Sequence, residues 1–255
     1  MKLSIFLAGI RPQNWLALYQ SIPNSTIITD YELVIVSPYD LPLELQNIDN
    51  VRLIKDWGKP TRCYQLGLLH SRGEYVVWGA DDGIFSPTLA IDKAFDIIPG
   101  NKGVVSFKYQ EGSPRAKGNK NRNENEWWRL GSFGVLREIP FVPNHYFLIM
   151  NALIKRSYFM ETGGWDCRFE QLGMAGPDMS IRLQNDGAEV VMGEMFMSVT
   201  HEKGTQLHKP IEDAHKKNDM PLFKQIYTNK SSQSRARVDF DNWKHTPAVW
   251  SRRFK

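Results

Sequence analysis

The chain has 255 residues, a length near the upper limit for one hydrophobic core, and it carries a net charge of +4. Hydrophobic residues make up 42% of the chain and charged residues 24%, which is typical of soluble globular proteins. No apolar run approaches the length needed to cross a bilayer. The composition therefore predicts one soluble domain with a modest C-terminal extension, and it argues against a membrane span.

The two ends of the chain differ in character. The N-terminal run Leu3–Ile10 is apolar, but it is short and lacks a small-residue cleavage site, so we interpret it as a first strand rather than a signal peptide. Cys63 and Cys167 show no metal-ligand spacing, which favours reduced thiols in a cytoplasmic protein. Residues 201–255 hold 12 Lys and Arg against 6 Asp and Glu, so the basic character belongs to the tail.

Basic and aromatic residues alternate in that tail between Trp243 and Phe254. This pattern suits an anionic membrane surface, a nucleic acid, or a segment packed on the domain. Packing or partial disorder is the interpretation we favour. The acidic balance of residues 1–200 speaks against a nucleic-acid-binding module, so we expect no nucleic acid partner.

Strand-like and helix-like segments alternate in the first hundred residues, which predicts a parallel sheet covered by helices. The predicted strands are Leu3–Ala8, Glu32–Ser37, Val51–Lys55, Tyr75–Trp78 and Gly103–Lys108. The predicted helices are Trp15–Ser21, Pro60–His70 and Thr88–Ile98.

The second half of the chain is less regular. Residues 110–126 are almost without apolar side chains, which predicts a mobile loop of a length usually kept for function. Phe147–Ile154 then reads as a strand, and Gly176-Pro177-Asp178 as the start of a helix that ends near Asn185. Glu189–Val191 and Met195–Thr200 read as two short strands.

One acidic motif follows the strand Tyr75–Trp78. The sequence from Gly73 to Asp82, with Pro87 after it, resembles the Gly-Glu-Tyr, apolar strand, acidic pair and proline of family 2-like GT-A glycosyltransferases. The resemblance implies that Asp82 binds a divalent metal, Mn²⁺ or Mg²⁺, and that Asp81 binds the ribose of a nucleotide sugar. A hard cation held by carboxylates would neutralise a diphosphate leaving group. Ala80 stands where the family has a first aspartate, and the alternative is a solvated Asp-Asp-Gly turn.

A second motif runs from Gly163-Gly164-Trp165-Asp166 to Asp178. It resembles the Gly-Gly-Phe-Asp and Glu-Asp segments of the same family, with Pro177 in place of the glutamate. The resemblance implies that Asp178 is the general base, which takes the proton of the acceptor hydroxyl during in-line attack. The alternative is an ordinary acidic residue in the first turn of a helix, where the helix dipole favours it.

Further candidates follow from the same resemblance, which covers roughly residues 2–205. It places His201 near the metal as a second ligand and Lys203 near the phosphates, although a lone histidine is more often structural. The remaining nucleotide-sugar-binding candidates are Ala8, Arg11, Asp40, Arg62 and Trp165. Solvated arginines and core tryptophans are the respective alternatives.

The sequence therefore predicts an α/β protein of the GT-A fold, with a mostly parallel central sheet flanked by helices. Residues 1–108 would bind the nucleotide sugar, residues 109–205 the acceptor, and residues 206–255 would form a basic C-terminal helix and tail. The expected function is inverting transfer of a sugar from a nucleoside diphosphate, with UDP as the default, to a saccharide or lipid-linked acceptor. A non-catalytic relative that binds nucleotide sugars or glycans is the alternative. We expect a cytoplasmic protein with peripheral contact to the inner membrane face through its tail.

Overall fold

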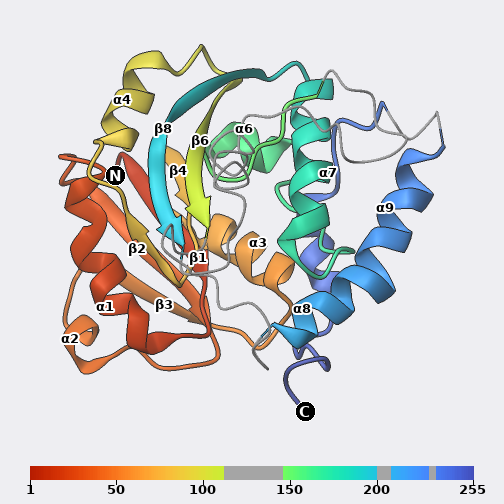
Figure 1. The fold of residues 1–255 in the computed structure, drawn as a ribbon, viewed down its shortest axis with the longest axis horizontal. Helices are drawn as coiled ribbons and strands as arrows, with labels where there is room; N and C mark the ends of the chain where they lie inside the picture. The colour runs from red at the N-terminus through yellow and green to blue at the C-terminus, as the bar shows by residue number, and fades with distance from the viewer. Residues whose placement is uncertain (112–145, 200–207, 230–233) are drawn as a thin grey trace, which may run out of the picture.

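The computed structural model describes residues 1–111, 146–199, 208–229 and 234–255. Its centre is an eight-stranded sheet in the order β3-β2-β1-β4-β7-β6-β8-β5, and helices cover both faces (Figure 1). The predicted α/β class and the mostly parallel sheet are therefore confirmed. None of the helices in the described part of the chain is long and apolar enough to cross a membrane.

The N-terminal half supplies four neighbouring parallel strands. These strands are β1 (Leu3–Ala8), β2 (Tyr31–Ser37), β3 (Val51–Lys55) and β4 (Tyr75–Trp78). The connecting segments carry the helices α1 (Pro12–Ser21), α2 (Leu43–Gln46) and α3 (Pro60–His70). Because the strands run in one direction, their carboxyl ends meet at one edge of the sheet, where connecting loops gather.

The other half of the sheet is mixed. Its strands are β5 (Gly83–Phe85), β6 (Gly103–Glu111), β7 (Ala152–Lys155) and β8 (Glu189–Val199). β6 and β8 pair in parallel, while β7 lies antiparallel between β4 and β6, and β5 lies antiparallel on the edge beside β8. The helices of this half are α4 (Ala90–Ile97), α6 (Arg156–Glu161) and α7 (Leu172–Asn185).

The central strands are buried on both faces, which explains their unbroken apolar sequences. In β1, Phe6 belongs to the core shared with α3, α6 and α7, whereas Ile5 and Leu7 belong to the core on the opposite face. In β4, Val76 and Val77 divide in the same way. The sheet is thus the middle of three layers.

The C-terminal segment packs onto this domain. It comprises α8 (Lys209–Ala214), a π-helical turn (His215–Asp219), α9 (Met220–Tyr227) and a 3₁₀ turn (Phe240–His245). α9 lies beside α7 (Figure 1), and the side chain of Gln65 in α3 donates to the carbonyl of Phe240 over 2.8 Å. The backbone N–H of Trp250 donates to the carbonyl of Trp57 over 2.8 Å. The described part of the tail is therefore packed on the domain, which is one of the two states, packing or partial disorder, that the sequence favoured.

Several predicted bounds differ from the observed ones. The strand predicted over Phe147–Ile154 begins only at Ala152, and the two short strands after Asp186 are one strand, β8. The short edge strand β5 escaped prediction. β6 continues through Glu111, so the first two residues of the predicted loop 110–126 belong to a strand, and residues 112–126 lie outside the described ones.

Candidate functional site

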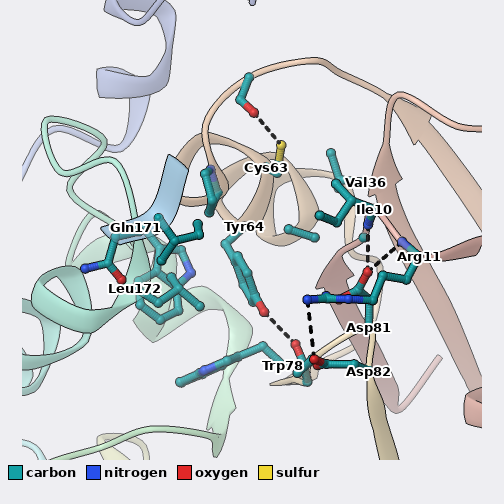
Figure 2. A pocket seen from close by; sticks show the side chains of 18 of the residues that line it. Ile10, Arg11, Val36, Cys63, Tyr64, Trp78, Asp81, Asp82, Gln171 and Leu172 are labelled. Atoms are coloured by element: carbon teal, nitrogen blue, oxygen red, sulfur yellow. Dashed lines mark hydrogen bonds and ion pairs between the residues drawn. The ribbon is translucent and has the colours of Figure 1, made fainter. Parts of the chain in front are cut away.

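A cavity of about 310 Å³ lies at the carboxyl ends of β1, β2 and β4. Ile10, Arg11, Asp81 and Asp82 lie on one side, whereas Gln171 and Leu172 from the start of α7 lie across from them (Figure 2). The wall between the two sides is mostly apolar, as expected of a small-molecule site. Both halves of the sheet and the tail therefore contribute to one pocket.

The acidic pair is organised around Arg11. One oxygen of Asp81, Oδ2, accepts the backbone N–H groups of Ile10 and Arg11 over 2.7 and 2.9 Å. The other, Oδ1, accepts Nη1 of Arg11 over 2.6 Å, while Nη2 of Arg11 lies 3.6 Å from Oδ2 of Asp82 (Figure 2). Asp81 therefore fixes the loop between β1 and α1, and with it the position of the Arg11 guanidinium.

Aromatic side chains form the floor of the cavity. The hydroxyl of Tyr64 donates to the carbonyl of Gly79 over 2.6 Å. Burial, together with the charges of Asp81 and Asp82, raises the pKa of Tyr64 far above its ordinary value, so its hydroxyl keeps its proton. Trp165 is 1% exposed and packs edge-on against Tyr64, with ring centroids 5.6 Å apart. Trp165 is therefore mainly a core residue, and one part of its surface lies in the cavity wall.

The C-terminal tail closes another side of the cavity through Trp250, Arg253 and Phe254. Nε1 of Trp250 donates to Glu170 over 2.6 Å, and Arg252 donates to both oxygens of the same carboxylate over 2.6 and 2.9 Å. The guanidinium of Arg253 lies 5.6 Å from the centre of the Trp250 ring. The tail residues at the cavity are therefore anchored to the domain.

Five of the predicted site residues line this cavity: Ala8, Arg11, Asp81, Asp82 and Trp165. Two others do not. The side chain of Asp40 is 88% exposed and pairs with Lys55 over 2.7 Å. His201 and Lys203 lie outside the described residues.

Arg62 is the second predicted residue that the structure keeps away from the cavity. Its Nε lies 3.1 and 3.0 Å from the two oxygens of Asp56, and its Nη1 donates to the carbonyl of Trp243 over 2.8 Å. Its side chain is 10% exposed. This guanidinium therefore ties the loop after β3 to the tail. Nucleotide binding by Arg62 stays a prediction.

Asp178 differs most from its predicted setting. α7 begins at Leu172 and not at Gly176, because the side chain of Gln171 accepts the N–H of Gly173 over 2.5 Å and so caps the helix there. Pro177 lies inside the helix, and Asp178 is fully buried in its second turn. The prediction that Asp178 lies in the first helical turn is wrong.

The carboxylate of Asp178 is enclosed by partners. Nε of Arg182 donates to its Oδ2 over 2.9 Å, the hydroxyl of Tyr227 donates to its Oδ1 over 2.7 Å, and Arg235 also binds Oδ1. Asp178 is not among the cavity-lining residues, whereas Gly176 on the same helix is. The role of Asp178 as a general base stays a prediction, and its surroundings favour a structural role.

The same buried cluster includes Asp166, which the sequence motif also contains. Burial alone would raise the pKa of Asp166, but hydrogen bonds and charge from Arg168, with the charge of Arg235, lower it to about 2. Arg235 joins Asp166 and Asp178 and thereby links the two parts of the motif. Two basic residues of the tail, Arg235 and Arg252, are thus used in ion pairs inside the domain.

The donor atoms at the acidic pair are poorly suited to a divalent metal. The described residues contain no group of three or more His, Cys, Asp or Glu side chains that could hold one. Both oxygens of Asp81 already accept hydrogen bonds, and the positive guanidinium of Arg11 lies next to both carboxylates. A second cation beside that guanidinium would be repelled. In this arrangement, the described residues do not fit the metal ion that the sequence resemblance implies.

The sequence interpretation missed the contribution of Tyr64, Gln171 and the tail residues to the cavity. Gln171 lies inside the second motif and Tyr64 two residues after Arg62, but the sequence singled out other side chains in both segments. Trp250 and Arg253 did stand out in the alternation of basic and aromatic residues. That signal was real, but a pattern within the tail cannot show which surface the tail covers.

The fold is that of the GT-A glycosyltransferases. The structure of residues 1–349 of TarS from S. aureus in complex with UDP-GlcNAc matches 92% of this chain and 69% of its own chain, with a TM-score of 0.56 and 13% identity. Its complex with UDP matches at 12% identity with the same TM-score, over 92% of this chain and 68% of its own. A longer TarS structure matches at a TM-score of 0.55 and 13% identity, over 79% of this chain and 37% of its own, so this chain spans little more than a third of that protein.

No family model and no curated protein matches the chain by sequence. At the identities found, the likeness to TarS concerns the fold. The function therefore has to be argued from the cavity and its residues.

Proposed function

We propose that this protein is a glycosyltransferase that uses a nucleoside diphosphate sugar as its donor. The observation that best supports the proposal is the position of the cavity, with Asp81 and Asp82 at the carboxyl end of β4 in a GT-A fold. Ligands of open α/β sheets bind at this edge. The solved complexes of the similar TarS hold UDP-GlcNAc and UDP, which makes UDP the default nucleotide.

The two sides of the cavity suit the two substrates. We assign the donor to the side of Ile10, Arg11 and Asp82, because the guanidinium there can bind phosphate. The acceptor, a saccharide or a lipid-linked sugar, would enter on the side of Leu172 and Gly176. Attack of its hydroxyl on the anomeric carbon forms the new glycosidic bond, and the nucleoside diphosphate leaves with the electron pair of the broken bond. The hydroxyl proton passes to water, and the configuration at that carbon is inverted.

Asp82 is the residue that we expect to act on the reacting sugar. Glycosyl transfer passes through a state in which positive charge develops on the sugar ring, and a fixed carboxylate stabilises that charge. Asp81 cannot take this role as easily, because both of its oxygens already hold the loop before α1.

The test compares Asp82→Asn with Asp40→Asn, a matched change at a carboxylate whose side chain is 88% exposed and outside the cavity. We expect Asp82→Asn to lower the rate of donor hydrolysis or transfer by at least about 10²-fold while Asp40→Asn leaves it unchanged. Release of the nucleoside diphosphate from a panel of nucleotide sugars is the measurement. Equal rates in both variants and the wild type would remove the acidic pair from the reaction.

A second candidate function is binding of a nucleotide sugar without transfer. The observation that favours it is the set of acidic side chains at the cavity, because Asp56 and Asp81 are both held by arginines. Asp82 also faces an arginine, with Nη2 of Arg11 3.6 Å from its Oδ2, so none of these three carboxylates stands apart from a positive charge. Tight donor binding by calorimetry, together with no nucleotide release under any acceptor tested, would favour this candidate over the transferase.

A further inference from the structure

The acceptor hydroxyl of the proposed reaction has to lose its proton as it attacks, and a side chain that accepts this proton speeds the step. Asp178, the residue that the sequence suggested for this role, is fully buried and does not line the cavity. Its carboxylate is bound by Arg182, Tyr227 and Arg235. Since a general base lies within hydrogen-bond reach of the proton that it takes, a side chain at the cavity is the better candidate.

The three carboxylates at the cavity lie next to arginines. Both oxygens of Asp81 accept hydrogen bonds from Arg11 or from the loop before α1. Both oxygens of Asp56 accept hydrogen bonds from Arg62. Asp82 lies on the donor side, with Nη2 of Arg11 3.6 Å from its Oδ2. Carboxylate oxygens that are engaged in this way are poorly placed to take a proton from the acceptor.

The uncharged titratable side chains at the cavity are those of Cys63, Tyr64 and His208. Burial raises the pKa of Cys63 and of Tyr64, so the thiol and the phenol keep their protons at neutral pH. An imidazole, in contrast, takes up and releases protons in this pH range. Of the described side chains that line the cavity, His208 is therefore the one whose chemistry best suits a general base.

The helix that follows His208 places it on the acceptor side. The carbonyl of His208 accepts the N–H of Glu212 over 3.0 Å, so the α-helical repeat starts at His208. Residues three and seven positions apart share one face of a helix, here His208, Ile211 and His215. Ile211 also lines the cavity, and Nδ1 of His215 lies 3.2 Å from Nε2 of Gln171. This face of α8 therefore packs against the start of α7.

The start of α7 lies across the cavity from the acidic pair. Gln171 and Leu172 are on one side, and Asp81 and Asp82 are on the other (Figure 2). A nucleophile that inverts an anomeric carbon approaches from the side opposite the leaving group, so its proton is released away from the diphosphate. His208 belongs to the side from which the acceptor would approach.

We propose that His208 is the general base of the transfer. A ring nitrogen of His208 takes the proton of the acceptor hydroxyl while the hydroxyl oxygen forms its bond to the anomeric carbon. The bond from that carbon to the diphosphate breaks, and the nucleoside diphosphate leaves with the electron pair. The imidazolium then passes the proton to water. This inference rests on the proposed function, because it assigns a residue to that reaction.

The experiment measures release of the nucleoside diphosphate, with water as the acceptor, from UDP-GlcNAc, UDP-glucose, GDP-mannose and dTDP-rhamnose. We expect His208→Ala to lower the fastest of these rates by about 10²- to 10⁴-fold, the usual contribution of a general base. The affinity for the corresponding nucleoside diphosphate, measured by calorimetry, should change by less than about 2-fold. The matched control is His70→Ala, because His70 is exposed at the end of α3, about 15 Å along that helix from Pro60 at the cavity. Its rate and affinity should equal those of the wild type.

Free imidazole distinguishes proton transfer from a structural role. It can occupy the space that His208→Ala leaves and take the proton, so it should raise the rate of this variant by about 10-fold or more. It should not raise the rates of the wild type, His70→Ala or Asp82→Asn. Thermal unfolding of each variant shows whether its fold is intact. His208→Gln has a similar volume but cannot take the proton, and it carries the rate test if His208→Ala does not fold.

The outcomes separate the inference from the proposed function. The inference would be overturned by a His208 variant that is as fast as the wild type, by a loss of rate that an equal loss of nucleotide affinity explains, or by a slow His208→Ala that imidazole does not accelerate. Each of these results leaves the proposed transferase standing. A wild-type protein that releases no nucleoside diphosphate from any of the four donors would overturn the proposed transfer and the inference with it.

Discussion

Two arginine–aspartate pairs in this molecule have the same chemistry and opposite surroundings. The pair of Arg11 and Asp81 lines the cavity, where its side chains are 15% and 6% exposed. The pair of Arg182 and Asp178 is closed off, with both side chains 0% exposed. The first pair is placed to meet a ligand, whereas the second is placed to hold α7 against its neighbours.

The partners of the two pairs make the difference concrete. Arg182 donates its two Nη groups to the carbonyls of Thr162 and Gly164 over 2.9 and 2.6 Å, and its Nε to Asp178. All three nitrogens of that guanidinium therefore bind protein groups. The comparison shows that a carboxylate in the expected motif can have a structural role, while residues elsewhere are placed to act on a ligand.

The largest expected effect on stability comes from breaking the buried pair of Arg182 and Asp178. Asp178→Ala leaves Arg182 and Arg235 without their carboxylate, and removing one partner of a buried ion pair costs about 3–5 kcal/mol. Arg235 keeps its pair with Asp166, so the loss falls mainly on Arg182. Denaturant unfolding measures this loss. The control is Asp241→Ala, because the Asp241–Lys244 pair is about half exposed and should contribute less than about 1 kcal/mol. A stable Asp178→Ala protein that has lost turnover but kept donor binding would restore Asp178 as the general base.

The next effect concerns acid sensitivity of the same cluster. The folded pKa of Asp166 is about 2, below its ordinary value of 3.8, so this carboxylate stabilises the fold above pH 4. The stabilisation should be lost as the pH falls from about 4 to 2, and it amounts to about 2 kcal/mol. We expect the free energy of unfolding of the wild type to fall by that much more than the free energy of Asp166→Asn between pH 5 and pH 2. If the free energies of unfolding of the two proteins change equally with pH, Asp166 is not the source of the pH dependence.

The smallest expected effect on stability concerns two glycines of α7, Gly173 and Gly176. A Cβ at Gly176 would find the carbonyl oxygen of Ile149 as its nearest neighbour, 3.9 Å away, whereas a Cβ at Gly173 would lie 2.8 Å from the Gln171 side chain. Gly176→Ala should therefore raise the free energy of unfolding by up to about 1 kcal/mol through helix propensity. Gly173→Ala should lower it, because the capping side chain must move. Destabilisation by Gly176→Ala would mean that α7 does not face an open cavity there.

The sequence was most informative where one physical cause dominates. Strands buried on both faces need unbroken apolar runs, so β1 and β4 were predicted with their observed bounds. Pro60 suits the first turn of a helix, and α3 begins there. The acidic pair was placed correctly at the end of β4, because parallel strands bring their carboxyl ends together.

The start of α7 shows where local reasoning fails. Pro177 also suits a helical first turn, but the cap at Gln171 sets the start at Leu172, four residues before the predicted start at Gly176, and the proline is accommodated inside the helix. The two carboxylate oxygens of Asp219 accept the N–H groups of Glu170 and Gln171 over 2.7 and 3.0 Å, so a distant segment fixes the start of α7. No pattern near Pro177 contains this information. The partners of Arg62 and Arg253 were hidden for the same reason.

The anchoring of the tail also sets an order of events during folding. Arg62 and the carbonyl of Trp243 are 181 residues apart in sequence, whereas Ser4 and Glu32, which join β1 to β2, are 28 apart. Closing the longer loop from an unstructured chain costs about 2 kcal/mol more in entropy, so it becomes favourable once the sheet has already shortened the path. We expect refolding molecules to regain their sheet first and their affinity for nucleotide later. For an interval during folding, the molecule would have a nearly complete architecture and an open, unfinished pocket.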